Sequence, residues 1–311
     1  MIAFVLSGGG NRGALQAGAI KALIGRGIYP DLIVGTSVGA LNGVVLAANP
    51  TLEGARCLAE GWQHTRRNDI FPGNTLTVGW RVLTGQGSLH GRENFRRFVL
   101  AKLPPSVRRF KDLKVPCLVT ATSLATGRLR LWGEGPNESL LDAILSSTSI
   151  PPFYAPYLYE NEFLVDGALV ANLPISHAIL RGARTIYTLE IIDDMVSGSR
   201  FGLVQTLTSS LNAMLNRQHE QERRTVALAH QRGVTIHDIK LTSGQSLPYN
   251  DFSHGTALVA AGERAALECV NALPAPRPRA LARLAQSLRG TFRALGARRE
   301  SDTGLPPAAA G

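Results

Sequence analysis

Short apolar runs alternate with amphipathic segments along most of the chain. The apolar runs at residues 2–6 and 32–34 each lead into a glycine-containing turn and then a segment of helical periodicity, at residues 12–25 and 40–48. Two strand–turn–helix units within the first fifty residues are typical of a parallel β-sheet. The pattern therefore predicts an α/β fold with a mostly parallel central sheet.

The same alternation continues to about residue 272. We expect further strands at residues 116–123, 163–165, 185–191 and 235–239, a hairpin partner at 128–132, and helices at 138–147, 175–181, 201–231 and 254–272. Residues 51–105 indicate mixed helix and loop, in which the glycine-rich stretch 71–91 is peripheral. Three prolines between residues 274 and 278 indicate a linker. We therefore predict one domain over residues 1–275 and a tail over residues 276–311.

Composition narrows the class of protein. No apolar run approaches the ~20 residues of a membrane-spanning helix, and the first residues lack the basic start of a secretory signal. Three widely spaced cysteines in apolar contexts, Cys57, Cys117 and Cys269, predict reduced and buried thiols without a metal site. We therefore expect a cytoplasmic protein. The sequence predicts no particular oligomeric state.

The second predicted strand ends in a candidate nucleophile. Gly35, Thr36, Ser37, Val38 and Gly39 fit the pattern G-x-S-x-G, with a strand before it and a helix after it. Glycines permit the strained turn that presents the serine hydroxyl, and the helix N-terminus offers free N–H groups to a developing oxyanion. A simple Gly/Ser turn opening a helix is the alternative interpretation.

The first predicted strand ends in a glycine-rich loop. Gly8, Gly9 and Gly10, followed by Arg12 and Gly13, can form an anion-binding turn at a helix N-terminus and so serve as an oxyanion hole. The same glycines satisfy the dinucleotide pattern G-x-G-x-x-G. That interpretation needs an acidic residue at the far end of the second strand, whereas Asp31 precedes that strand.

Two kinds of residue could serve as the general base. Five histidines follow Asp166 in the chain, namely His177, His219, His230, His237 and His254, but none has a distinctive context. Asp166 ends an apolar strand and precedes Gly167, and a desolvated carboxylate can accept a proton directly. From the residues alone, an ordinary Asp-Gly turn remains an alternative.

Four blocks in order resemble the patatin-like phospholipase family over about residues 1–275. They are Gly8–Gly9–Gly10–x–Arg12–Gly13, the serine motif at residues 35–39, a Ser-x-x-Pro loop, and Asp166–Gly167–Ala168. The resemblance implies a three-layer α/β/α sandwich and a Ser37–Asp166 dyad that uses no histidine. It also implies an oxyanion loop containing Gly9, Gly10 and Arg12. The family often has glycine where this chain has Ala168.

The resemblance further implies a lipid or lysophospholipid substrate and hydrolysis through an acyl-enzyme, with no metal or organic cofactor. The proline-rich block corresponds to residues 149–153, so Pro151, Pro152 and Phe153 are expected to wall the acyl pocket. Residues 71–91 and a helix near residues 201–215 are candidates for a lid. A catalytically idle lipid-binding or regulatory protein on the same fold is the alternative.

The net charge of +10 is concentrated in the tail. Seven arginines and no acidic residue lie between Arg277 and Arg299, which leaves +3 for the rest of the chain. If residues 279–297 form a helix, Leu281, Leu284, Leu288, Phe292 and Leu295 share one stripe. A basic amphipathic helix suits an anionic membrane surface, and packing on the body is the alternative. We expect no nucleic-acid partner, because the tail lacks interleaved aromatic residues.

Overall fold

A computed structural model describes residues 1–73, 88–192, 233–245 and 247–272, with Thr84 and scattered positions between 206 and 229. Several predictions lie outside these residues: most of the 74–87 stretch, the helix at 201–231 with its proposed lid, and the tail at 276–311 with its helix at 279–297. Residues 1–272 form one compact unit. The division of the chain at residue 275 stays a prediction.

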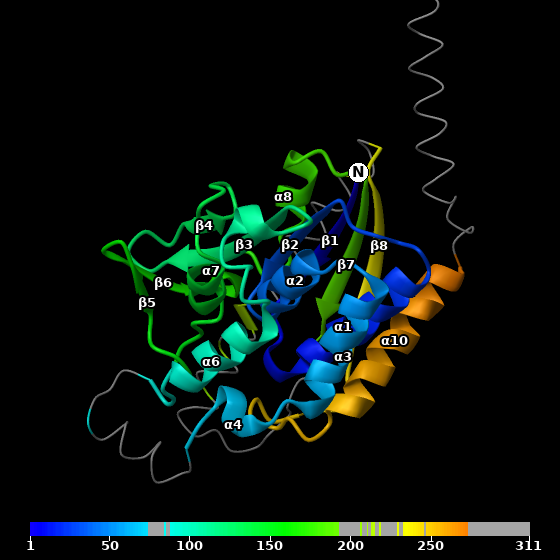
Figure 1. The fold of residues 1–311 in the computed structure, drawn as a ribbon. Coiled ribbons are helices and arrows are strands. Elements are labelled where there is room, and N and C mark those ends of the chain that lie inside the picture. The colour runs from blue at the N-terminus through cyan, green and yellow to red at the C-terminus, as the bar shows by residue number, and fades with distance from the viewer. Residues whose placement is uncertain are drawn as a thin grey trace, which may run out of the picture. The chain divides into compact units, whose positions relative to one another are not determined.

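A mixed β-sheet of eight strands forms the centre of the described part (Figure 1). The strands are β1 (Ile2–Leu6), β2 (Leu32–Thr36), β3 (Cys117–Ser123), β4 (Leu129–Trp132), β5 (Tyr157–Tyr159), β6 (Glu162–Asp166), β7 (Thr185–Ile191) and β8 (Thr235–Leu241). Strands β3, β2, β1, β7 and β8 are parallel neighbours in that order, whereas β4, β5 and β6 pair antiparallel. The predicted mostly parallel sheet is confirmed.

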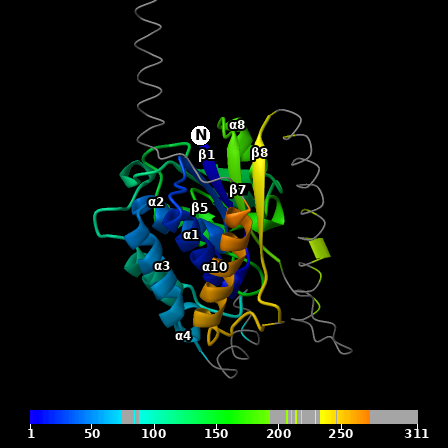
Figure 2. The ribbon, with the colours of Figure 1, turned by 90° about the vertical axis from the view of Figure 1, so that its right-hand side faces the viewer.

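Helices cover both faces of this sheet (Figure 2). The side of α1 also carries α2, α3 and α10, and α8 lies on the other face. The bounds are α1 (Gly13–Gly25), α2 (Val38–Ala48), α3 (Leu52–His64), α4 (Arg67–Ile70), α6 (Glu93–Lys102), α7 (Leu140–Ser147), α8 (Ile175–Leu180) and α10 (Gly255–Asn271), with short 3-10 turns η1 (Gly10–Arg12), η2 (Phe110–Asp112) and η3 (Gly167–Leu169). This arrangement is the α/β/α sandwich expected from the sequence.

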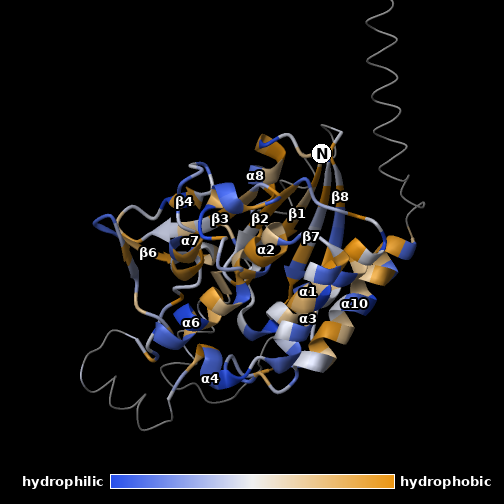
Figure 3. Cartoon of the chain, viewed as in Figure 1, coloured by the Kyte–Doolittle hydropathy of each residue, from blue (hydrophilic) through white to orange (hydrophobic). Residues whose placement is uncertain are grey.

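The core follows the alternation of side chains along the strands. Ala3 and Val5 of β1 join a buried cluster with Ile175 and Ala178 of α8, so the residues between them face the opposite helices. Helix α2 is apolar around almost its whole circumference and is buried at nearly every position (Figure 3). A helix buried in this way holds its first residue, directly after Ser37, in a fixed place.

Helices α1 and α10 pack backbone to backbone through two glycines. A Cβ built on Gly18 would lie 1.9 Å from the Val259 carbonyl oxygen, and one built on Gly262 would lie 1.8 Å from that of Leu15. Only glycine permits so close an approach. The sequence pattern predicted both helices but not their contact.

The structure corrects the sequence expectations in two places. Strand β5 was not predicted, because it has only three residues and follows a proline-rich loop, so no alternation could show it. Of the three cysteines, only Cys117 is buried as predicted. Cys57 is exposed on the outer side of α3, and Cys269 is partly buried; all three are free. None of the helices in the described ranges is long and apolar enough to cross a membrane.

Candidate active site

Strand pairing brings the candidate nucleophile and base to one point. Thr120 of β3 pairs with both Thr36 of β2 and Leu131 of β4, so β2 and β4 lie on opposite edges of β3. Ala121 pairs with both Arg130 of β4 and Asp166 of β6, so β6 also lies opposite β4. Strands β2 and β6 therefore share one edge of β3 and meet end to end.

The meeting point lies between Thr36 and Asp166. Strand β2 ends opposite Thr120, and β6 ends opposite the next residue, Ala121. Ser37 directly follows Thr36, so it turns out of the sheet where β6 delivers Asp166. The parallel register with β1 places Gly8 at the same level, since Leu6 pairs with Gly35.

Ser37 occupies a strained turn between β2 and α2. Its φ of 54° and ψ of −122° are rarely adopted by non-glycine residues. The flanking glycines make this turn possible: a Cβ on Gly35 would lie 2.4 Å from the Gly39 carbonyl oxygen, and one on Gly39 would lie 2.5 Å from that of Leu6. Such strain at a nucleophile is typical of a catalytic turn.

Asp166 is a fully buried carboxyl group. Burial raises its pKa from the ordinary 3.8 to about 7, and the nearby Ser37 hydroxyl and the Ala168 N–H lower it in part. Oδ1 accepts the Ala168 N–H at 2.9 Å, whereas Oδ2 has no partner at hydrogen-bonding geometry among the described residues. A carboxylate with one open oxygen beside a serine hydroxyl can accept that proton.

The residues after Asp166 are packed against the same region. A Cβ on Gly167 would lie 2.2 Å from the Thr120 hydroxyl oxygen, so the position requires glycine. Ala168 is buried and supplies the N–H that holds Asp166.

The glycine-rich loop faces Ser37, and its N–H groups fall into two sets. The Gly8 N–H donates to Asn172 Oδ1 at 3.0 Å, and the N–H groups of Arg12 and Gly13 donate to carbonyls of the loop itself. Within the described ranges, the N–H groups of Gly9 and Gly10 in the loop, and that of Val38 directly after Ser37, have no hydrogen-bond partner. These three groups can bind an oxyanion, whereas those of Gly8 and Gly13 are occupied.

The side chain of Arg12 binds a backbone carbonyl in another part of the chain. It is buried, and Nη2 donates to the Leu247 carbonyl at 3.3 Å. The Asn11 side chain bonds the carbonyls of Pro248 and Asp251 at 2.8 and 2.6 Å. Both residues therefore join the loop to residues 247–251, which the sequence did not indicate.

A row of buried hydrogen bonds, from the Trp62 indole through two side-chain amides, supports the start of the loop. Trp62 Nε1 donates to Asn42 Oδ1 at 2.8 Å, Asn42 Nδ2 donates to Gln16 Oε1 at 3.0 Å, and Gln16 Nε2 donates to the Ser7 carbonyl at 2.8 Å. The row crosses α3, α2 and α1 and ends at the residue before Gly8. It links three helices to the position of the loop.

The proline-rich loop contributes to an aromatic cluster. Phe153 is buried. The centroid of its ring lies 4.0 Å from the ring centroid of Tyr249 and 6.0 Å from that of Phe71. The carbonyls of Pro152 and Phe153 accept N–H groups of residues 89 and 90. Pro151 is exposed.

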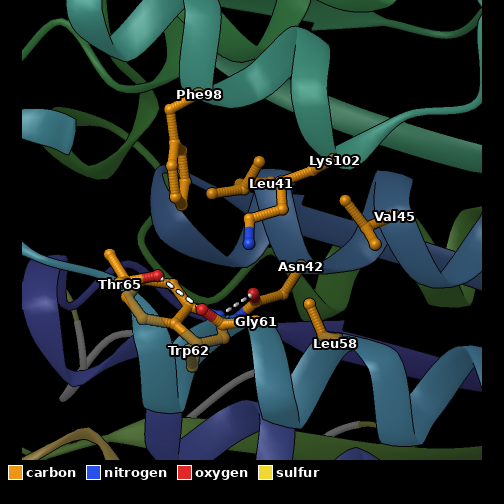
Figure 4. A pocket seen from close by; sticks show the side chains of 9 residues that line it. All are labelled: Leu41, Asn42, Val45, Leu58, Gly61, Trp62, Thr65, Phe98 and Lys102. Carbon is orange, nitrogen blue, oxygen red and sulfur yellow. Dashed lines mark hydrogen bonds between the residues drawn. The ribbon is translucent and has the colours of Figure 1, made fainter.

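The structure contains a pocket whose lining differs from that of the predicted acyl pocket (Figure 4). It lies between α2, α3 and α6, and Phe98 and Lys102 of α6 point toward Leu41 of α2. Pro151, Pro152 and Phe153 do not line it, so their role as pocket walls stays a prediction.

Three of the five histidines considered as the base lie in the described part of the chain, and their surroundings differ from those of a general base. His237 packs on the ring of Tyr187, His254 lies beside Asp251, and His177 is on α8, where burial followed by Arg181 lowers its pKa. No hydrogen bond joins any of the three to Ser37 or Asp166. His219 and His230 lie outside the described residues.

The positions of the acidic residues bear on whether the site could bind a dinucleotide or a metal ion. Asp31 lies at the amino end of β2, where its carboxylate accepts the Ile2 N–H at 2.8 Å, so it is at the opposite end of the strand from the glycine loop. This position does not fit a dinucleotide site. The described part of the chain contains no group of three or more His, Cys, Asp or Glu residues that could hold a metal.

Two residues of the site were missed in the sequence. Asn172 holds the Gly8 N–H, and Ser147 Oγ accepts the Ser37 N–H at 2.8 Å. Ser147 ends an apolar helix just before the proline-rich loop, and Asn172 follows Asp166 by six residues. Buried polar residues beside recognised motifs are the only signal that could have pointed to them.

Comparison with known proteins decides the family. The model of the family described as patatin-like phospholipase matches residues 4–179, which is more than half of the chain. The chain belongs to the patatin-like phospholipase family. The matched region of this patatin-like chain begins within β1 and ends within α8, and it therefore includes Ser37, Asp166 and the glycine-rich loop.

The individual relatives share a low sequence identity with this chain. Patatin-like phospholipase domain-containing protein 7 of Rattus norvegicus is 28% identical over 192 residues, which cover 61% of this chain and 13% of that protein. Lysophospholipase NTE1 of Mycosarcoma maydis is 28% identical over 199 residues, which cover 62% of this chain and 10% of that protein. The patatin-like chain thus spans about a tenth of the length of these curated relatives.

Among solved structures, VipD of Legionella pneumophila is 14% identical, with a TM-score of 0.47 over 86% of this chain and 66% of that one. Type III effector protein ExoU is 15% identical, with a TM-score of 0.38 over 98% of this chain and 66% of that one. The resemblance stated from the sequence is confirmed by the family match, which supports lipid acyl hydrolysis at the level of the family.

Proposed function

We propose that this patatin-like protein is a serine lipid acyl hydrolase of the phospholipase A, lysophospholipase or esterase type. Ser37 is the nucleophile and Asp166 is the general base. The observation that carries the proposal is the buried Asp166 carboxyl, with a pKa of about 7. It lies at the end of β6, next to the end of β2, after which the chain turns at the strained Ser37. A carboxyl with this pKa can both accept and return a proton near neutral pH.

In the first step, Asp166 takes the Ser37 hydroxyl proton as Oγ attacks the ester carbonyl carbon. The N–H groups of Gly9, Gly10 and Val38 stabilise the oxyanion, and each such donor lowers the activation barrier by roughly 3 kcal/mol. The C–O bond to the alcohol breaks, and Asp166 returns its proton to the departing oxygen. The acyl group remains on Ser37.

In the second step, Asp166 takes a proton from water, and the hydroxide attacks the acyl-enzyme carbonyl. The second oxyanion occupies the same N–H groups. The Ser37–acyl bond breaks, Ser37 regains its proton from Asp166, and the fatty acid leaves. Neither step requires a metal or an organic cofactor.

The proposal includes the setting in which the protein works. The substrate is a membrane lipid or lysophospholipid, and the protein is cytoplasmic and peripheral to an anionic membrane. The arginine-rich residues 277–299 supply the charge for that contact.

The decisive test is hydrolysis of a medium-chain p-nitrophenyl ester by the wild type, Ser37→Ala and Asp166→Asn. Both variants should lose at least about 1,000-fold in kcat while their circular dichroism stays that of the wild type. Asp112→Asn, which removes a carboxylate from η2, is the control and should keep full activity.

Labelling with a fluorophosphonate probe separates the enzyme from a catalytically idle lipid-binding protein. The wild type should label at Ser37, and Ser37→Ala should not. A wild type that neither labels nor hydrolyses esters would favour the idle alternative. Full activity in Ser37→Ala would exclude Ser37 as the nucleophile.

A further inference from the structure

Ser147 contacts the nucleophile from outside the recognised motifs. It is the last residue of α7 and is fully buried, and its Oγ accepts the Ser37 N–H at 2.8 Å. We propose that Ser147 is a positioning residue that holds Ser37 in its reactive conformation. The inference rests on the proposed function, since it assigns a role relative to the Ser37 nucleophile.

The conformation of Ser37 explains why an external acceptor is needed. Its φ of 54° lies in the left-handed region, which a serine does not adopt without support from its surroundings. The Ser37 carbonyl is held from the other side, because it accepts the N–H groups of Ala40 and Leu41 in the first turn of α2. With Ser147 on the N–H, both backbone groups of Ser37 are fixed, and they set the direction of its Cα–Cβ bond.

The segment that carries Ser147 also contacts the base. Two residues further on, the Ser149 carbonyl accepts the Asp166 N–H at 3.0 Å. Ser149 Oγ in turn accepts from Arg92 at 2.8 Å and donates to the Leu145 carbonyl at 2.6 Å. Residues 147–149 therefore form a clamp that contacts the backbone of both dyad members and fixes the distance between them.

Ser147 is the part of this clamp that a substitution can test, because the contact with Asp166 is made by backbone atoms. The chain also offers a matched control. Ser146 is equally buried, but its hydroxyl donates at 3.1 Å to Ala143 within α7. Ser146→Ala and Ser147→Ala thus remove the same atom from adjacent buried positions, and only the second releases Ser37.

The experiment compares the two variants in the full chain. The readouts are the rate of fluorophosphonate labelling at Ser37, the kcat and KM for a medium-chain p-nitrophenyl ester, and the thermal unfolding temperature. Ser147→Ala should slow labelling and lower kcat by about 10- to 100-fold, with KM changed less than about two-fold. Ser146→Ala should keep both rates within about two-fold of the wild type, even if its unfolding temperature falls as far as that of Ser147→Ala.

Equal labelling rates in Ser147→Ala and the wild type, with Ser37 labelled in both, would overturn the inference and leave the proposed function intact. If Ser147→Ala does not fold, Ser147→Cys decides the question, because it keeps the volume and weakens the acceptor. A reduced labelling rate in that variant supports the clamp, and an unchanged rate overturns it. A wild type that does not label at Ser37 would overturn both the clamp and the proposed function.

Discussion

Asp166 links activity to pH at the scale of a single residue. Because burial raises the pKa of Asp166 to about 7, the carboxylate form needed for proton abstraction should be scarce in mild acid. We expect kcat/KM to rise about ten-fold per pH unit below pH 7 and to level off above it. Initial rates with a p-nitrophenyl ester between pH 5 and 9 measure this profile, and a profile flat down to pH 5 would contradict the role of Asp166 as the base.

The same buried carboxyl should reduce stability at alkaline pH. Between 3.8 and about 7 the folded protein binds a proton that the unfolded chain releases, so the free energy of unfolding falls as the pH rises through this window. The total change is up to about 4 kcal/mol at ~1.4 kcal/mol per pH unit.

Asp166→Asn should therefore be more stable than the wild type at pH 8 and similar to it at pH 4. Urea unfolding at the two pH values, followed by circular dichroism, measures the difference. Equal stability of the two proteins at pH 8 would show that the buried carboxylate carries no such cost.

At the scale of elements, three helices meet the glycine loop through the row of hydrogen bonds of Trp62, Asn42 and Gln16. Asn42→Leu leaves the Trp62 N–H and the Gln16 carbonyl oxygen buried without partners. We expect a loss of roughly 2–4 kcal/mol in the free energy of unfolding, measured in urea.

The control for this substitution is Val44→Ala, a fully buried position on the same helix. It creates a cavity costing on the order of 2 kcal/mol but leaves the row of hydrogen bonds intact. At a temperature where both variants are folded, Asn42→Leu should lose more kcat than Val44→Ala. Equal effects on kcat would show that the hydrogen bonds of Trp62, Asn42 and Gln16 stabilise the fold but have no separate effect on the site.

The elements that could be predicted from the sequence are those whose pattern is local. Strands β1 and β7 have the predicted bounds because apolar runs flanked by turns define them. Strand β5 pairs with the neighbouring β6, but its three residues are too few to show an alternation. The glycine contact of α1 with α10 depends on partners far along the chain, so no local pattern shows it. The same reason applies to Asn172 and Ser147, whose bonds reach backbone N–H groups more than a hundred residues away.

Ser37 and Asp166 are candidates from the sequence because each lies where an apolar strand ends in a turn, and because their blocks resemble those of the patatin-like phospholipase family. Their shared place along β3 could not be predicted, since it depends on β2 and β6 occupying the same edge of one strand. Nor could the sequence separate the loop N–H groups that are free from those that are bonded, because Asn172 takes the Gly8 N–H from another element.

At the scale of the whole molecule, the charge is unevenly divided between the body and the tail. Seven of the arginines lie between residues 277 and 299, and a membrane contact through this tail should act on binding and not on chemistry. Replacing Arg283, Arg289 and Arg293 by glutamate in the full chain should therefore weaken sedimentation with vesicles of anionic phosphatidylglycerol by about ten-fold or more. Hydrolysis of a soluble p-nitrophenyl ester should stay unchanged.

The matched control reverses the same amount of charge on the body, at the exposed arginines Arg26, Arg56 and Arg97. If net charge alone drives adsorption, the two triple variants should lose vesicle binding equally, and the proposed role of the tail would be wrong. If the tail makes the contact, the body variant should keep most of its binding. Raising the salt concentration should weaken the binding that remains, because the attraction is screened within about 10 Å at 0.1 M salt.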